Sequence, residues 1–151
     1  MKEESMIALG CDHGGYAMMQ VIKKHLDERG LEYKDCGCFS EKSVDYPDYA
    51  QAVCREIQAG NCDKGILICG TGIGVCIAAN KMRGIRAALC SDCYSAQKTR
   101  EHNDANVLTL GGRVIGPELA LMIADIFLDT PFSGEERHKR RIEKLEKYYG
   151  E

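Results

Sequence analysis

The feature that most limits how this chain can fold is a regular alternation of short apolar segments with longer segments of helical periodicity. The expected strands are residues 6–9, 31–36, 65–69, 85–89 and 106–110. The expected helices are residues 16–29, 47–59, 72–80, 93–101, 117–128 and 135–149. Gly30, Pro47 and Pro117 mark three of the boundaries. Alternation of this kind favours parallel strands joined by crossover helices.

From this order we predict an α/β fold: a Rossmann-like, doubly wound, five-stranded parallel sheet in three layers, α/β/α. The 151 residues fit one domain, 1–151, without internal repeat or linker. Segment 65–69 is almost purely apolar, so it is expected to be a central strand. Ligands of such sheets bind beyond the carboxyl ends of the strands, and we expect the function in the loops there.

The composition argues against several classes of function. The formal net charge is −3, which provides no basic field for nucleic acid or an acidic membrane surface. No segment approaches the roughly 18–20 apolar residues that cross a bilayer, and residues 1–5 are polar, unlike a signal peptide. We therefore expect a cytoplasmic protein with no nucleic-acid or membrane partner.

The chain has nine cysteines, which in a cytoplasmic protein should be reduced thiols. Many lie in apolar contexts and are expected to pack as small hydrophobic residues. Cys90 and Cys93 form a Cys-x-x-Cys pair, which is also compatible with a redox pair or half of a zinc site. Cys36 and Cys38 are a poor second pair for zinc, so we expect structural cysteines and no metal site.

Segment 69–74, Cys-Gly-Thr-Gly-Ile-Gly, has the character of an anion-binding turn. Its three glycines follow a buried strand and open a helix, where backbone N–H groups and the positive helix end favour an anion. A tight strand–helix turn alone would explain one or two of them. Val75 stands where a dinucleotide fingerprint needs glycine and a cysteine phosphatase needs arginine, and the P-loop ending is absent. The loop is therefore expected to bind an anion in another way.

Cys69 and Thr71 supply the reactive groups of this loop. A cysteine just before a helix N-terminus is favoured as the thiolate, and Thr71 can hydrogen-bond or orient the sulfur. Beside backbone N–H donors, a thiolate can attack a carbonyl carbon. It can equally remove a proton α to a carbonyl while the N–H groups hold the oxyanion. The residues alone leave both chemistries open.

Charged residues elsewhere are candidates for holding a substrate. Arg137 and Arg141 share a face of the last helix and could form a phosphate clamp, although the spacing alone is also typical of a solvated basic face. Arg113 is better placed at a strand end, whereas Arg86 is expected to be paired and structural. His102 ends a helix, where it can act as an acid or base or simply interact with the helix dipole.

These motifs together resemble ribose-5-phosphate isomerases of the B type, in a family that also contains allose-6-phosphate isomerase and galactose-6-phosphate isomerase subunits. The resemblance covers nearly the whole chain. It rests on residues 10–15, 45–47, 65–74, 78–81, 84–87, 100–106 and 112–116, and on Arg137-His138 followed by Arg141. It implies aldose–ketose isomerisation through a cis-enediol, in the pentose phosphate pathway, without metal or organic cofactor.

The resemblance also implies a role for each matching residue. Cys69 matches the base that moves a proton between C1 and C2, Thr71 the hydroxyl that supports it, and His102 the acid that opens the furanose ring. The residues matched to the anion hole for the enediolate are Gly70, Gly72, Ile73 and Gly74. The residues matched to contacts with the sugar or its phosphate are Asp12, His13, Tyr46, Asn103, Arg113, Arg137 and Arg141.

Several alternatives stay open within this resemblance. The motif residues handle C1, C2 and the phosphate, so an allose or galactose 6-phosphate is compatible with them. A non-catalytic sugar-phosphate-binding subunit is a further alternative, against which the presence of Cys69, Thr71 and His102 argues. Family members are homodimers, sometimes tetramers, with active sites shared between subunits. Helix 135–149 is therefore expected at a subunit interface, where His102 and the arginines would serve a neighbour's pocket.

Overall fold

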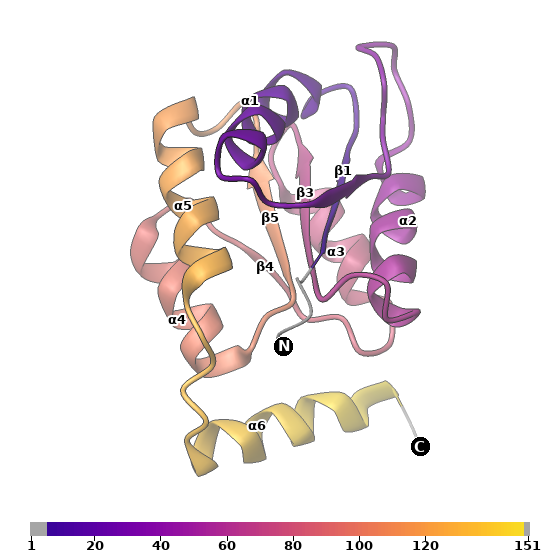
Figure 1. Cartoon of the computed structure of the whole chain (residues 1–151). Helices are drawn as coiled ribbons and strands as arrows, with labels where there is room; N and C mark the ends of the chain where they lie inside the picture. Colours follow the sequence, from indigo (N-terminus) through magenta and orange to yellow (C-terminus); the bar gives the residue numbers. More distant parts are fainter. Residues whose placement is uncertain (1–5, 150–151) are drawn as a thin grey trace.

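The computed structural model describes residues 6–149 and contains the predicted five-stranded parallel sheet (Figure 1). The strand order is β2-β1-β3-β5-β4, and every neighbouring pair is parallel. The strands are β1 (Ile7–Cys11), β2 (Tyr33–Asp35), β3 (Lys64–Cys69), β4 (Ala87–Leu89) and β5 (Val107–Gly111). The predicted α/β fold class is therefore confirmed, with β3 at the centre of the sheet.

Helices cover both faces of the sheet and complete the three layers. On one face lie α1 (Tyr16–Glu28), α4 (Cys93–Asn103) and α5 (Pro117–Asp129). On the other lie α2 (Tyr46–Gln58) and α3 (Ile73–Asn80). The last helix, α6 (Glu136–Glu146), continues into a 3₁₀ turn (Lys147–Tyr149) and crosses beyond one end of the sheet instead of lying on a face (Figure 1).

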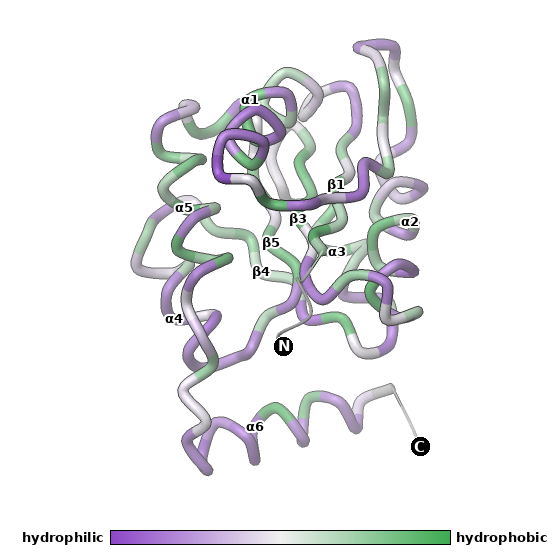
Figure 2. Tube along the Cα trace, in the orientation of Figure 1, coloured by the Kyte–Doolittle hydropathy of each residue, from purple (hydrophilic) through white to green (hydrophobic). Residues whose placement is uncertain are grey.

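The core follows the period-two alternation of the strands. Ile66 and Ile68 pack under the α1, α4 and α5 layer, whereas Leu67 and Cys69 face the α2 and α3 layer. All four side chains are buried. Figure 2 shows hydrophobic residues concentrated in the strands and on the inner sides of the helices, with α6 largely hydrophilic. Cys69 therefore lies at the strand end, on the side of the sheet from which α3 begins.

Three of the boundaries that differ from the sequence prediction have a clear local cause. β1 continues to Cys11 because Cys11 donates to the Gly37 carbonyl at 2.6 Å and stays paired with β3. β4 begins only at Ala87, because the Arg86 N–H is bound by the Asn106 side chain at 2.8 Å. α4 extends past the predicted residue 101 to Asn103, where Asp104 adopts a left-handed conformation and closes the helix.

The two ends of the sheet carry different groups of predicted site residues. The loops after β1, β3 and β5 gather at the carboxyl ends of the strands. α4 runs back along the sheet, so its last residues lie where β4 and β5 begin, and α6 crosses beyond that same end (Figure 1). The fold thus separates residues 69–74 from residues 102–103 and from α6.

The chain ends, membrane-spanning helices and metal-binding groups were also subjects of prediction. Residues 1–5, for which a non-signal sequence is expected, and the last two residues of the predicted 1–151 domain lie outside the described residues. In the part of the chain that the structure describes, no helix is long and apolar enough to span a bilayer. Within residues 6–149, no three His, Cys, Asp or Glu side chains form a group that could hold a metal ion.

Candidate active site

The centre of the site is the turn from β3 into α3. Cys69 is the last residue of β3 and is buried, and its Sγ accepts a hydrogen bond from the Gly72 N–H at 3.1 Å. Gly72 is the N-cap of α3, so the sulfur lies at the N-terminal end of that helix, where backbone N–H groups lack intrahelical acceptors. The sulfur therefore has a direct N–H donor and lies at the positive end of a helix.

Gly72 can only be glycine. Its φ of 79° lies in the left-handed region, and a Cβ would fall 2.6 Å from the Leu89 side chain and 2.8 Å from the Leu110 carbonyl carbon. Its own carbonyl accepts a hydrogen bond from the buried Thr109 hydroxyl at 2.9 Å. The N–H that meets Cys69 is therefore held by backbone geometry and by a neighbouring strand.

Thr71 and Ile73 form the exposed part of the turn. The Thr71 hydroxyl oxygen accepts a hydrogen bond from the Ile73 N–H at 3.2 Å, so it caps the start of α3. The predicted contact of Thr71 with sulfur is not present in this arrangement. Because the hydroxyl uses only a lone pair in this bond, its proton stays available to an oxygen of a bound molecule.

The loop after β1 packs directly against this turn. A Cβ on Gly14 would lie 3.0 Å from the Gly70 nitrogen, so the two backbones touch. Asp12 is buried, and its Oδ1 accepts the N–H groups of Gly14 at 2.9 Å and Gly15 at 3.1 Å. One carboxylate oxygen of Asp12 therefore shapes the entry into α1, a structural task that the sequence prediction did not include.

Three further predicted residues surround the turn. The His13 Nδ1 accepts the Val44 N–H at 3.2 Å, which leaves Nε2 as the protonated nitrogen of the neutral ring. The Arg113 N–H donates to the Gly70 carbonyl at 3.0 Å, and its guanidinium lies 3.4 Å from the position of a Cβ on Gly70. The Tyr46 ring covers Gly74, where a Cβ would fall 2.6 Å from Cζ. All of these residues lie in or beside the loops at the carboxyl ends of the strands.

The remaining predicted residues form a separate group at the opposite edge. His102, near the end of α4, stacks on His138 of α6, with ring centroids 4.2 Å apart and planes inclined by 13°. Arg137 and Arg141 are both exposed on α6, and Arg137 forms an ion pair with Glu135. The acidic neighbour that the sequence places beside the candidate clamp thus contacts one of its two arginines.

His138 is the main residue of this second group that the sequence prediction left without a role. It is buried, and its Nε2 has no hydrogen-bond partner among the described residues. Burial, followed by the nearby charges of His102 and Arg137, lowers the pKa of His138 below its usual value. The sequence contains one signal for the burial of His138, namely that His138, Ile142 and Leu145 recur with the period of one helix face.

The other cysteines differ from Cys69 in their surroundings. All nine are free thiols, and burial raises the pKa of Cys54 to about 12 and that of Cys90 to about 11. Cys11 lies 3.9 Å from Cys38, sulfur to sulfur, and its pKa is raised to about 12, first by burial and then by Cys38. Thiols of this kind are poor nucleophiles and pack as small apolar groups.

Comparisons with known sequences and structures find sugar-phosphate isomerases over most of the chain. The model of the family described as Ribose/Galactose Isomerase matches residues 7–145. The chain is 52% identical over 139 residues to ribose-5-phosphate isomerase B of Escherichia coli, which covers 92% of this chain and 93% of that protein. It is 46% identical over 130 residues to D-erythrulose-4-phosphate isomerase of Pectobacterium atrosepticum, with 85% of each chain covered. The solved structure of Clostridium thermocellum ribose-5-phosphate isomerase B superposes with a TM-score of 0.93, at 49% identity over 95% of this chain and 97% of that one.

Proposed function

The chain belongs to the ribose/galactose isomerase family, and from that premise we propose that Cys69 and the 70–74 backbone catalyse its reaction. The protein is an aldose–ketose isomerase of the ribose-5-phosphate isomerase B type, interconverting ribose 5-phosphate and ribulose 5-phosphate. The observation that carries the catalytic assignment is the 3.1 Å hydrogen bond from the Gly72 N–H to the Cys69 sulfur at the start of α3.

The proposed chemistry is a proton transfer through an enediolate. The Cys69 thiolate removes the proton from C2 of the open-chain aldose, and the negative charge moves onto the carbonyl oxygen. Backbone N–H groups of residues 70–74 hold that oxyanion, and Thr71 supports it with its hydroxyl. The Cys69 thiol then returns the proton to C1 while the hydroxyl proton passes from O2 to O1. Electrons and protons balance within the substrate, so the proposal includes no cofactor or metal.

The two separated groups of residues support a site shared between subunits. We infer a homodimer, possibly extended to a tetramer, in which α6 of one subunit meets the Cys69 loop of the other. His102 would then open the furanose ring, and Asn103, Asp12 and Tyr46 would contact sugar oxygens. The phosphate would be held by His13, Arg113, Arg137 and Arg141. What supports this is that Cys69 and its backbone N–H neighbours lie at one edge of the sheet, whereas His102, Asn103 and the α6 arginines lie at the other.

The site must also select the number of carbon atoms in the sugar phosphate. We propose a five-carbon sugar phosphate, used in the pentose phosphate pathway of the cytoplasm. The support for this is that the E. coli relative, at 52% identity, is named for ribose 5-phosphate. A second relative, at 46% identity, is named for the four-carbon D-erythrulose 4-phosphate. Sequence identity of this order is therefore shared by enzymes for sugars with different numbers of carbon atoms. Allose 6-phosphate and galactose 6-phosphate are the competing substrates in this proposal.

A substrate panel tests this proposal directly. We expect the kcat/KM of the purified protein to be at least about tenfold higher for ribose 5-phosphate than for allose 6-phosphate, galactose 6-phosphate or D-erythrulose 4-phosphate. The ratio reports differential stabilisation of the transition state, and each missing or extra carbon displaces the phosphate from its contacts. A higher kcat/KM for another phosphate would reassign the substrate, and no turnover of any would favour the non-catalytic subunit.

The arginines of α6 should act on binding more than on chemistry. We expect Arg137→Ala and Arg141→Ala each to raise KM for ribose 5-phosphate by about tenfold while kcat changes by less than about threefold. A phosphate contact far from C1 and C2 is made equally in the ground and transition states, which is why KM should carry the effect. Steady-state kinetics measure it, with Lys139→Ala, an exposed cation of the same helix, as the control. Unchanged KM in both variants would contradict the clamp.

A further inference from the structure

The helix that carries the two candidate phosphate arginines has few contacts with the rest of the chain. Of the α6 residues, His138 alone is buried, and Leu145 is 42% exposed. A groove of about 350 Å³ lies beside its last turn, lined by Leu145, Glu146 and Tyr148 from this end of the chain and by residues around β4. Apolar packing therefore cannot by itself fix where this end of α6 lies.

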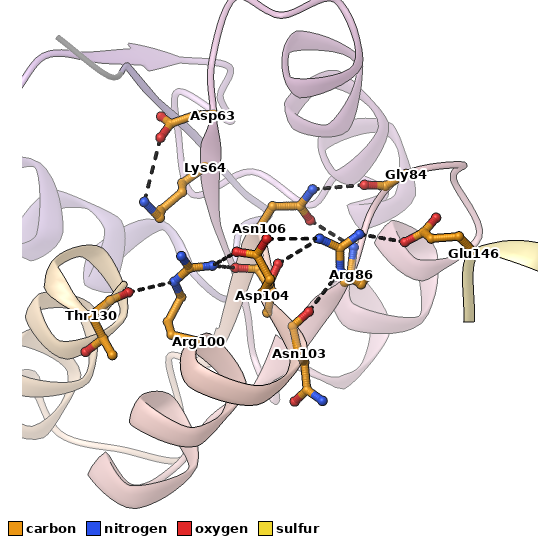
Figure 3. Close-up of polar contacts among 11 residues, drawn as sticks. Asp63, Lys64, Gly84, Arg86, Arg100, Asn103, Asp104, Asn106, Thr130 and Glu146 are labelled. Carbon is orange, nitrogen blue, oxygen red and sulfur yellow. Dashed lines mark hydrogen bonds and ion pairs between the residues drawn. The ribbon is translucent and has the colours of Figure 1, made fainter. Parts of the chain in front are cut away.

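Arg86 makes the polar connection at this end (Figure 3). Its Nη1 donates to Glu146 Oε1 at 2.5 Å, its Nε to the Asn103 carbonyl at 2.9 Å, and its Nη2 to the Asp104 carbonyl at 2.9 Å. One planar guanidinium thus joins the last residue of α6 to the two residues that end α4. A lysine ammonium is a point charge on a flexible stem and cannot reproduce this fork.

The end of α4 is rigid enough to serve as an anchor. Asp104 is its left-handed cap, and its carboxylate accepts a hydrogen bond from the buried Arg100 at 2.8 Å. Arg100 also donates to the carbonyls of Ala105 at 2.7 Å and Thr130 at 3.0 Å. Figure 3 shows these two arginines on either side of Asp104, with the Asn103 carboxamide turned away from Arg86.

A second connection holds the other end of α6 to the same helix. The His138 ring stacks on the His102 ring, with the ring centroids 4.2 Å apart. In the linker before α6, the Ser133 N–H donates to the Glu101 carbonyl at 3.2 Å. His138 and Glu146 are separated by eight residues, about 12 Å along a helix axis. Arg141 lies between these two points and Arg137 just before the first, so both arginines are placed by the pair of connections together.

We propose that Arg86 is a positioning residue that, through Glu146, sets the distance between the α6 arginines and the His102–Asn103 end of α4. This inference rests on the proposed function, since it takes the phosphate of the sugar to be held by α6. Loss of the Arg86–Glu146 connection leaves α6 attached only at its first half and free to pivot about His138. A misplaced clamp weakens binding of the phosphate without changing the chemistry at Cys69.

The test removes Glu146 and leaves the Arg86 contacts with α4 intact. We expect Glu146→Ala to raise KM for ribose 5-phosphate by about threefold to tenfold, with kcat within about twofold of the unchanged protein. The inhibition constant of inorganic phosphate, a probe of the clamp alone, should rise by the same factor. Backbone amides of residues 141–149 should exchange faster with deuterium, whereas those of α4 should not. Glu146→Gln, which keeps an acceptor for Nη1, should restore part of the KM.

The matched control is Arg29→Gln. Arg29 also joins two elements by ion pairs, to Asp125 at 2.7 Å and Asp129 at 2.8 Å, but it links α1 to α5. It should leave KM and the phosphate inhibition constant unchanged. Glu146→Ala with KM and phosphate inhibition within twofold of the unchanged protein would overturn the proposal, even if the melting temperature falls. A lower kcat at constant KM would overturn it as well.

Failure of the inference can be told apart from failure of the proposed function. If the unchanged protein turns over no sugar phosphate, the proposed function fails, and calorimetry with inorganic phosphate then tests the positioning role without turnover. Weaker phosphate binding in Glu146→Ala than in Arg29→Gln supports the role of Arg86. Equal binding of phosphate by the two variants contradicts it. Arg86→Lys provides a second variant, expected to weaken phosphate binding as much as Glu146→Ala because the lysine cannot span both partners.

Discussion

Replacing Cys69 by alanine should lower kcat for ribose 5-phosphate by about a thousandfold or more, the loss expected when the base of a proton transfer is removed. The structure gives the reason, because Cys69 is the thiol at the start of α3 and receives the Gly72 N–H. Alanine fills the same space apart from one sulfur atom, so the fold and the phosphate contacts should survive. Stopped-flow or coupled assays measure kcat, and circular dichroism and inorganic phosphate binding establish that the variant is folded and competent.

The matched control for this prediction is Cys62→Ala. Cys62 is also buried, and burial raises its pKa, but it lies before β3 at the opposite end of the strand from Cys69. Its removal should leave kcat within about twofold, since a buried thiol packs as a small apolar group. If Cys69→Ala kept more than a few per cent of the turnover, the base would have to be sought elsewhere in the loop.

The fold was predictable because its signals are local and repeated. Each strand–helix boundary is marked by glycine, proline or a change of hydrophobic period, and parallel pairing follows from the order of elements. One of the boundary errors arises where a side chain competes with the backbone. β4 starts later than predicted because the Asn106 side chain takes the Arg86 N–H, and periodicity carries no information about such a bond. The order β2-β1-β3-β5-β4 was likewise open until β5 was seen between β3 and β4.

The site divides in the same way between local and long-range features. The turn at residues 69–74 was predictable, since its glycines, its thiol and the helix it opens are adjacent in the sequence. The hydroxyl of Thr109 on the Gly72 carbonyl was not, because the two residues meet only when β5 lies beside β3. The stacking of His138 on His102 also depends on a contact between α4 and α6 that no spacing rule reports. The Asp12 carboxylate, by contrast, accepts from N–H groups only two and three residues on, so its turn has a local signal that the prediction did not use.

The separation of the two groups of candidate residues gives the fold a clear consequence. Cys69 and the N-terminus of α3 lie at the carboxyl ends of the strands, while His102 and the α6 arginines lie beyond the ends at which β4 and β5 begin. A single chain with this geometry could not bring an acid from α4 and a base from β3 to one sugar. Association of two chains resolves the problem if each supplies what the other's edge lacks.

Mixing two inactive variants should therefore restore activity. We expect Cys69→Ala and His102→Asn to be almost inactive alone on ribose 5-phosphate, the first without its base and the second without the acid that opens the ring. Unfolded together and refolded, or produced in one cell, half of the dimers combine one chain of each kind. In such a dimer one site has lost both groups, whereas the other joins the intact Cys69 of one chain to the intact His102 of its partner. The mixture should reach about a quarter of the activity of the unchanged protein.

Mixing Cys69→Ala with Cys69→Ser, a pair that shares its defect, controls for refolding and should recover little. If each site were built within a single chain, the first mixture would be no more active than its components, and the α4 and α6 residues would need another role.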